Sequence, residues 1–298
     1  MKNILIIGCG LIGSSLLRSI SEKKIAKKIF VHEKSKSNIL KIKKLKLPCE
    51  IIGDLKKIIP NLDLIIFCTP LGEYEKIILK INRYLLPKTI ITDVGSSKEK
   101  SMDLIKRKLK KGIFWTSSHP IAGSEVSGPE NGVKNLFLNK WCILIKEKNT
   151  NRKHLLILTK FWKKIGSNVA IMDSKKHDTV FSMTSHLPHL IAYNLVKTAT
   201  DFEKQQKYEL IKFSAGGLRD FSRIAASNEI MWRDIFFNNQ KNISKVIDLF
   251  IKNLRSFKRD IQFKNNKSII KKLVNTKKVR KKIIKLKQDI NKPDFGRN

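Results

Sequence analysis

A glycine-rich turn near the N-terminus constrains this chain more than any other feature. The sequence Gly8-Cys9-Gly10-Leu11-Ile12-Gly13 directly follows an apolar, strand-length run at 4–7 and precedes a helical pattern at 11–21. In such a G-x-G-x-x-G unit, the first glycine permits a tight turn, the second lets the backbone approach a pyrophosphate, and the third lets helix and strand pack closely. The helix N-terminus then offers free N–H groups to the phosphates. We therefore predict dinucleotide binding at Gly8, Gly10, Leu11, Ile12 and Gly13; the alternative is an ordinary glycine turn without a ligand.

The residue after the second apolar run bears on the choice of dinucleotide. This run, at 29–32, ends beside Glu33, twenty residues beyond Gly13. A carboxylate at this place can accept hydrogen bonds from the adenosine ribose hydroxyls and would repel a 2′-phosphate. We therefore expect NAD in preference to NADP. Lys34 and Lys36 leave NADP open, because an ammonium group can neutralise the extra phosphate.

The first 172 residues alternate between strand and helix patterns. Apolar runs of strand length at 62–68, 89–94, 113–118, 141–145 and 168–172 are interspersed with helical patterns at 73–85 and 155–165. Such alternation is typical of an α/β fold with a doubly wound, Rossmann-type parallel sheet. Open α/β sheets bind ligands at the carboxyl ends of their strands, so we expect Thr69, Pro70 and Asp93 to border the cofactor. The alternative is that these segments are plain βα turns.

The pattern changes after Asp173, where the segments 176–200, 204–212 and 229–254 all suit helices and none suits a strand. Pro188 lies inside the first of these segments and should kink it. We therefore expect a dinucleotide-binding Rossmann domain at 1–172, an all-α domain at 173–264 and a basic helical tail at 265–298.

Composition limits the classes of protein to which the chain can belong. Its net charge is +37, but the lysines are spread over every segment and mixed with Ile and Asn, which we interpret as compositional bias. A polyanion-binding arm at 264–292 is the alternative. The four cysteines form no C-x-x-C pair, so neither a zinc site nor a redox motif is indicated. No apolar run approaches the ~18 residues of a membrane span, and no signal-peptide pattern opens the chain, so we expect a cytoplasmic protein.

Three further clusters carry candidate chemistry. His119 lies in a Pro-, Gly- and Ser-rich stretch at 117–125 after a predicted strand, so we expect it in a loop at the carboxyl edge of the sheet. The stretch at 185–189 reads S-H-L-P-H, and it lacks the cysteine or carboxylate that would make a metal site convincing. The stretch at 216–225 has two glycines followed by closely spaced Arg and Asp residues. Its arginines could bind a carboxylate in a bidentate fork or form a structural pair with Asp.

These clusters occur together, and in the same order, in one known family. The segments G-C-G-L-I-G-S-S, S-S-H-P-I-A-G-S-E-x-S-G, S-H-L-P-H, G-G-L-R-D-F-S-R-I-A and M-W-R-D-I make the chain resemble the prephenate dehydrogenases, also called cyclohexadienyl dehydrogenases when arogenate is accepted. The resemblance covers roughly residues 3–260. It implies a Rossmann-type domain, a helical domain that forms a homodimer, and an active site between the two.

The resemblance also implies roles for individual residues. His119 matches the catalytic histidine, and Ser96 matches a serine that contacts the substrate hydroxyl near the nicotinamide. Arg223 matches the arginine that holds a substrate carboxylate, and Glu125 matches an acidic residue at the site entrance. The remaining implied substrate-side residues are Ser185, His189 and Trp232.

The implied reaction is the NAD-dependent oxidative decarboxylation of prephenate to 4-hydroxyphenylpyruvate in tyrosine biosynthesis. A neutral imidazole, with an ordinary pKa of ~6.5, can accept the hydroxyl proton. His189 favours prephenate over arogenate, although an arogenate-preferring or dual-specificity enzyme is open. More distant alternatives are another two-domain β-hydroxyacid dehydrogenase, which would place a catalytic lysine in its helical domain, and a basic nucleic-acid-binding protein.

Overall fold

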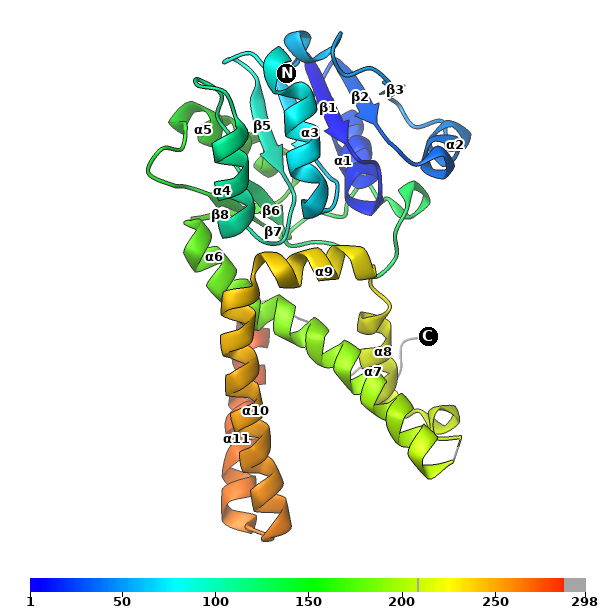
Figure 1. Cartoon of the computed structure of the whole chain (residues 1–298), viewed down its shortest axis with the longest axis vertical. Coiled ribbons are helices and arrows are strands. Elements are labelled where there is room, and N and C mark those ends of the chain that lie inside the picture. Colours follow the sequence, from blue (N-terminus) through cyan, green and yellow to red (C-terminus); the bar gives the residue numbers. More distant parts are fainter. Residues whose placement is uncertain (208, 287–298) are drawn as a thin grey trace.

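A five-stranded parallel sheet forms the centre of the N-terminal half of the protein (Figure 1). The computed structural model describes residues 1–207 and 209–286. The sheet has the strand order β3-β2-β1-β4-β5, which is the expected Rossmann-type arrangement. Its strands are β1 (Asn3–Ile7), β2 (Lys28–His32), β3 (Glu50–Ile51), β4 (Leu64–Phe67) and β5 (Ile90–Asp93), and the helices between and after them are α1 (Leu11–Glu22), α2 (Lys36–Lys44), α3 (Tyr74–Ile81) and α4 (Glu99–Lys108).

Both faces of this sheet are buried, which explains why its strands are continuously apolar. Alternate residues of a strand point to opposite faces. Ile4 and Ile6 pack on the face covered by α1 and by α5 (Arg152–Ile165), whereas Leu5 and Ile7 pack on the face covered by α3 and α4. The second core also includes Trp232 and other side chains of α9 (Glu229–Asn238), so the helical half of the chain is anchored to the sheet there.

A separate three-stranded sheet carries the candidate catalytic histidine. It consists of β6 (Ser118–Pro120), β7 (Trp141–Ile145) and β8 (Asn168–Met172), with β6 antiparallel to β7 and β8 parallel to it. The predicted strand at 113–118 is wrong, because Trp115 forms only an isolated bridge to Ile91 of the first sheet. The chain then crosses to the second sheet. His119 is therefore paired with Ile143 inside a strand, where the sequence suggested a loop.

The remaining elements are helices. They are α6 (Ser174–Phe181), a π-helical segment at Ser182–His186, α7 (Leu187–Gln206), α8 (Gly216–Ala225), α9, α10 (Gln240–Gln262) and α11 (Asn266–Lys285). The π-helical turn precedes Pro188, whose ring and missing N–H disturb a regular ladder, as expected. The predicted helix at 204–212 is wrong, because Lys207 adopts a left-handed φ of 59° and ends α7. The predicted helix at 229–254 is divided at Asn239.

Figure 1 shows how these helices are arranged below the sheet. Helix α9 lies against the α/β domain, while α7 and α10 diverge away from it and α11 runs back alongside α10. The basic tail predicted at 265–298 begins with α11, and its residues 287–298 lie outside the described part. Among the described residues, no helix is long and apolar enough to cross a membrane.

Candidate active site

The turn between β1 and α1 has the geometry of a phosphate cradle. Gly8 adopts a φ of +89°, which glycine tolerates without strain. A Cβ on Gly13 would lie 2.1 Å from the carbonyl oxygen of Gly8, whereas a Cβ on Gly10 would meet no atom within 4 Å. Helix α1 begins at Leu11 and Ile12 without a side-chain cap. Open space at Gly10 and uncapped N–H groups behind it fit a dinucleotide pyrophosphate.

Glu33 lies beside this turn, immediately after β2. Its Oε2 accepts a hydrogen bond from the backbone N–H of Cys9 at 2.8 Å, and its Oε1 accepts one from Ser35 N–H at 2.9 Å. The carboxylate is thereby fixed against the glycine turn, with lone pairs left for ribose hydroxyls. Lys34 is one of the two lysines that could neutralise the 2′-phosphate of NADP. It forms an ion pair with Glu73 at 2.6 Å.

Thr69 and Pro70 follow β4 and also border the glycine turn. A Cβ on Gly8 would lie 2.9 Å from the Thr69 methyl group, so the two segments are in close contact. Thr69 Oγ1 is buried and has no hydrogen-bond partner among the described residues. Buried hydroxyl groups are usually hydrogen-bonded, so this one is available to bind a ligand. Pro70 precedes a short 3₁₀ turn at Leu71–Glu73, where Asp234 Oδ2 of α9 accepts the Gly72 N–H at 2.9 Å.

Asp93, which the sequence suggested as a neighbour of the cofactor, lies at the end of β5, and its carboxylate is engaged by other side chains. The residue is 1% exposed, and Lys98 Nζ, itself fully buried, donates to its Oδ2 at 2.6 Å. Its Oδ1 accepts hydrogen bonds from Trp115 Nε1 and Ser117 Oγ. Because both of its oxygens accept hydrogen bonds from protein donors, Asp93 links β5 to Lys98 and to the segment that precedes β6.

His119 is buried in β6, with 7% of its surface exposed. Its Nδ1 lies 2.8 Å from Nε2 of His177 on α6, and its ring packs edge-on against Phe181 with 5.0 Å between centroids. Lys98 Nζ donates a hydrogen bond to the carbonyl oxygen of Ser118, the residue before His119, at 2.8 Å. This bond helps to fix the position of β6. No described residue forms a hydrogen bond with Nε2 of His119, so this nitrogen is available to a substrate.

The electrostatic surroundings keep His119 neutral. Burial lowers its pKa well below the usual range, and the nearby His177 and Lys98 lower that pKa further. Burial likewise lowers the pKa of His177, although the adjoining Asp178 opposes the shift. A neutral imidazole is the form that can accept a proton.

The S-H-L-P-H segment contributes His189 to a stacked pair of rings with Trp232, which we call the aromatic wall. His189 stacks on Trp232 of α9 with 3.8 Å between ring centroids, and its Nδ1 bonds to the carbonyl oxygen of Ser185 at 2.9 Å. Trp232 Nε1 is buried without a hydrogen-bond partner among the described residues. Burial lowers the pKa of His186 to about 4, against smaller opposing effects that include a contact with the backbone of Ser96. Ser96 thus lies near this second histidine cluster, beyond the end of β5.

Arg223 links the two halves of the molecule through an ion pair with Glu125. Its Nη1 lies 3.3 Å from Oε2 of Glu125, which follows β6, while Arg223 itself belongs to α8. Arg223 Nε is buried and has no partner within the described residues. The guanidinium therefore retains donors for a further anion.

Comparison with known proteins identifies the family. A family profile described as the nucleotide-binding domain of prephenate dehydrogenase matches residues 16–171, and one described as its dimerization domain matches residues 173–278. The two profiles together span most of the chain.

The chain belongs to the prephenate dehydrogenase family.

Individual relatives cover nearly the whole chain. A cyclohexadienyl dehydrogenase from Zymomonas mobilis is 30% identical over 94% of this chain and 95% of its own length. A prephenate dehydrogenase from Lactococcus lactis is 30% identical over 94% of this chain and 77% of its own length. The crystal structure of prephenate dehydrogenase from Aquifex aeolicus, in complex with hydroxyphenyl propionate and NAD+, has a TM-score of 0.88 at 33% identity and covers 95% of this chain and 98% of that one. The protein is thus an oxidoreductase of this family.

Sequence reasoning missed three residues of this dehydrogenase that lie around the candidate base: Lys98, His177 and Asp178. The clearest signal for Lys98 is its place in the D-V-G-S-S-K segment after β5. His177 and Asp178 lie in the first turns of a helix, where polar residues are common. Their burial follows from the packing of α6 against α4 and from the contact between His177 and His119 of β6.

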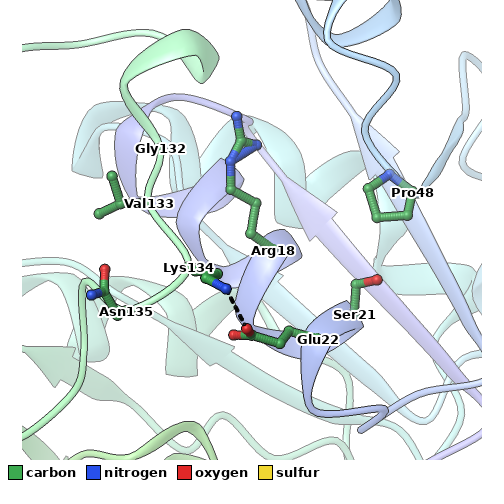
Figure 2. A pocket seen from close by; sticks show the side chains of 8 residues that line it. All are labelled: Arg18, Ser21, Glu22, Pro48, Gly132, Val133, Lys134 and Asn135. Atoms are coloured by element: carbon green, nitrogen blue, oxygen red, sulfur yellow. Dashed lines mark hydrogen bonds and ion pairs between the residues drawn. The ribbon is translucent and has the colours of Figure 1, made fainter.

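The open pocket in Figure 2, with a volume of about 620 Å³, lies elsewhere in the dehydrogenase. It is bounded by Arg18 and Glu22 of α1, by Pro48 and by the segment 132–135, and Lys134 reaches Glu22 across it at 2.7 Å. None of its lining residues belongs to the predicted site. The nearby polar contacts hold the segment that follows Glu125 against α1, as in the bond from Val133 N–H to Ser15 Oγ.

Proposed function

We propose that this protein oxidises prephenate with NAD and releases 4-hydroxyphenylpyruvate and carbon dioxide, with His119 as the general base. The observation that carries the proposal is the state of His119: a neutral, buried imidazole has one nitrogen held by His177 and the other free. It lies on the strand that follows the end of β5, within the domain that contains the dinucleotide cradle.

We infer that residues of the N-terminal half would hold each part of the cofactor. The glycine turn and the first turn of α1 would hold the pyrophosphate, Glu33 the adenosine ribose, and Thr69 the segment next to them. NAD, when bound, accepts the hydride from the carbinol carbon of the substrate. Glu33 favours NAD over NADP because it would repel a 2′-phosphate, and the Lys34–Glu73 ion pair removes one lysine that could neutralise that phosphate.

His119 supplies the proton acceptor. Its Nε2 takes the proton of the substrate's ring hydroxyl as the hydride leaves the same carbon. The ring carboxylate then departs as carbon dioxide, and its bonding electrons complete an aromatic ring, which makes the reaction effectively irreversible. Ser96 would hydrogen-bond to the substrate hydroxyl and keep it directed at the base. General-base assistance of this kind is typically worth ~10²–10⁴-fold in rate.

Arg223 and the aromatic wall would hold the substrate. Arg223 keeps unused donors beside its ion pair with Glu125, so it can bind a substrate carboxylate without deprotonating. Glu125 lies at the entrance and competes with that carboxylate for the guanidinium. His189 and Trp232 would line the side-chain end, with Ser185 holding His189 in place. We favour prephenate over arogenate because His189 of the S-H-L-P-H segment matches a histidine that the family resemblance associates with prephenate-accepting members.

The helical half would complete the enzyme as a homodimer. Its long helices bury few of their own side chains: α7 buries only Leu187 and Ala192, and α8 and α11 bury none. The apolar residues that they expose, such as Phe202 and Leu254, are the type that a second copy would cover. In this division of labour, residues 1–172 bind NAD, 173–264 dimerise and contact substrate, and 265–298 form a basic appendage. We expect the enzyme to work in the cytoplasm.

Steady-state assays with two substrates and two cofactors test this proposal. Purified protein is given prephenate or arogenate with NAD or NADP, and reduced cofactor is followed by its near-ultraviolet absorbance. The proposal predicts the largest kcat/KM with prephenate and NAD. Turnover of arogenate alone would establish the arogenate alternative. Absence of turnover in all four mixtures, from folded protein shown to bind NAD by calorimetry, would overturn the proposed reaction.

A further inference from the structure

A line of buried polar side chains leads away from the nitrogen of His119 that would not touch the substrate. His119 Nδ1 lies 2.8 Å from His177 Nε2, and His177 Nδ1 lies 2.8 Å from Asp178 Oδ1. His177 is fully buried, and Asp178 is 1% exposed. Buried polar groups of this kind are expensive unless each donor meets an acceptor, so the directions of these two hydrogen bonds are constrained.

The directions follow from the surroundings of Asp178. Its Oδ1 also accepts the backbone N–H of Lys98 at 2.8 Å, and its Oδ2 accepts the N–H of Glu99 at 2.9 Å and the hydroxyl of Ser97 at 3.3 Å. A carboxylate surrounded by donors acts as an acceptor, so His177 Nδ1 must carry a proton and donate it.

The proton on His177 Nδ1 determines the tautomer of both imidazole rings. If neutral His177 is protonated at Nδ1, its Nε2 has only a lone pair, and His119 must therefore donate from its own Nδ1. Neutral His119 then has its lone pair on Nε2, the nitrogen to which no described residue forms a hydrogen bond. In the other tautomer, Nε2 would carry a proton, and His119 could not act as a base from that side.

We propose that His177, oriented by Asp178, is a positioning residue that holds His119 in the tautomer whose Nε2 can accept the substrate proton. This inference rests on the proposed function and extends it to two residues that do not touch the substrate. When Nε2 takes the proton, the new imidazolium faces the His177 lone pair and, beyond it, the carboxylate. The pair thus also stabilises the charge that appears during the reaction.

Other groups that face this pair come from several elements. They are the buried ammonium of Lys98 at the start of α4, the carboxylate of Asp93 at the end of β5, the thiol of Cys142 on β7, and His186 in the π-helical turn. Lys98 opposes protonation of both His119 and His177, whereas Asp178 favours protonation of His177. Asn239 Nδ2 forms hydrogen bonds to the carbonyl oxygen of Asp178 and to His186 Nδ1. It thereby links the His119–His177 pair to His186.

The tautomers can be measured without any turnover. Selective nitrogen-15 labelling of histidine, followed by multiple-bond proton–nitrogen spectra, distinguishes the Nδ1–H and Nε2–H forms of each ring. Single His→Gln variants assign the signals. We expect both His119 and His177 in the Nδ1–H form near neutral pH. Detection of His119 in the Nε2–H form in the wild-type protein would overturn the proposal, even if the protein oxidises prephenate.

Two substitutions of His177 separate positioning from general loss of structure. In His177→Gln, the amide lies near the former Nε2, and its oxygen can still accept the His119 Nδ1–H. In His177→Asn, the amide lies near the former Nδ1 and can reach only Asp178. We expect His177→Asn to lower kcat by roughly 10²-fold or more with little change in KM. His177→Gln should recover at least tenfold of that loss.

The control is His154→Gln, which changes another buried histidine, on α5 and outside this line. It should retain wild-type kcat. Equal kcat values for the Asn and Gln variants at position 177, with both proteins folded by circular dichroism and binding NAD, would contradict the tautomer mechanism. Inactivity of the wild-type protein with prephenate would remove the proposed function, whereas the spectra would still decide the tautomer assignment.

Discussion

At the scale of single residues, the candidate site shows which parts of an active site a sequence can disclose. His119, Glu125 and Arg223 were recognisable because they belong to distinctive local segments. The ion pair between the last two could not be predicted, since it joins residues on different domains. His177 and Asp178 were missed for a related reason: their role depends on a neighbour that lies 58 positions away in sequence. The proposed role of His177 and Asp178 therefore depends on their contact with His119, which the sequence around them does not reveal.

Arg223 gives a prediction at this scale. Arg223→Ala removes a charged group that we expect to bind a substrate carboxylate, so the KM for prephenate should rise roughly ten- to hundredfold, as expected for a lost charge-assisted hydrogen bond. The change in kcat should be smaller. Initial-rate kinetics at saturating NAD measure both constants, with the exposed Arg255→Ala on α10 as the control. An unchanged KM would rule out the assigned role.

At the scale of elements, the prediction from sequence succeeded where a periodic pattern was packed on both sides. Strands β1, β2, β4 and β5 came out as expected because their apolar runs are buried on both faces. Strand β6 did not, because its three residues contain a buried histidine and a proline and resemble a loop in composition. Helix α7 ends because Lys207 adopts a left-handed conformation. The hydrophobic pattern of the sequence does not predict this conformation.

The glycine turn offers a paired prediction. Gly13→Ala places a Cβ 2.1 Å from the Gly8 carbonyl oxygen, so it should separate α1 from β1, lower Tm and abolish NAD binding. Gly10→Ala meets no protein atom within 4 Å, so it should leave Tm unchanged and weaken NAD binding by crowding the pyrophosphate. Thermal unfolding and calorimetric titration distinguish the two. Normal NAD affinity in both variants would show that the cofactor binds elsewhere.

The buried Lys98–Asp93 pair joins β5, α4 and β6, which makes it a prediction about element assembly. Lys98→Met would leave the Asp93 carboxylate without its cation in a dry environment, at a cost of about 3–5 kcal/mol. Urea unfolding measures this cost, and the exposed Lys106→Met on α4 is the matched control. Equal stability of the two variants would mean that the pair does not hold these elements together.

At the scale of the whole molecule, both domains contribute residues to the candidate site. The burial of its histidines makes the stability of the fold sensitive to acid. Burial lowers the pKa of His119, His177, His186 and His189 in the folded state. The unfolded chain therefore binds protons first as the pH falls below ~6.5, and stability declines from there toward the folded-state pKa values. For His186 alone, with a pKa of about 4, full acidification costs on the order of 3 kcal/mol.

Thermal unfolding at a series of pH values checks this expectation. Tm should be nearly constant from pH ~8 to ~7 and should fall steadily between pH ~6.5 and ~4. His186→Gln should flatten that fall, because it removes one of the groups that take up a proton on unfolding. A Tm that does not change over the acid range would show that these histidines are as accessible to protons in the folded protein as in the unfolded chain.

On the proposed mechanism, His119 accepts the proton when prephenate is oxidised. The most direct test is a single-turnover measurement of NADH formation, with enzyme in excess over prephenate and saturated with NAD, for the wild-type protein and His119→Asn. We expect the variant to bind NAD with wild-type affinity and to form NADH ~10²–10⁴-fold more slowly. A variant that forms NADH at nearly the wild-type rate would show that His119 is not the general base.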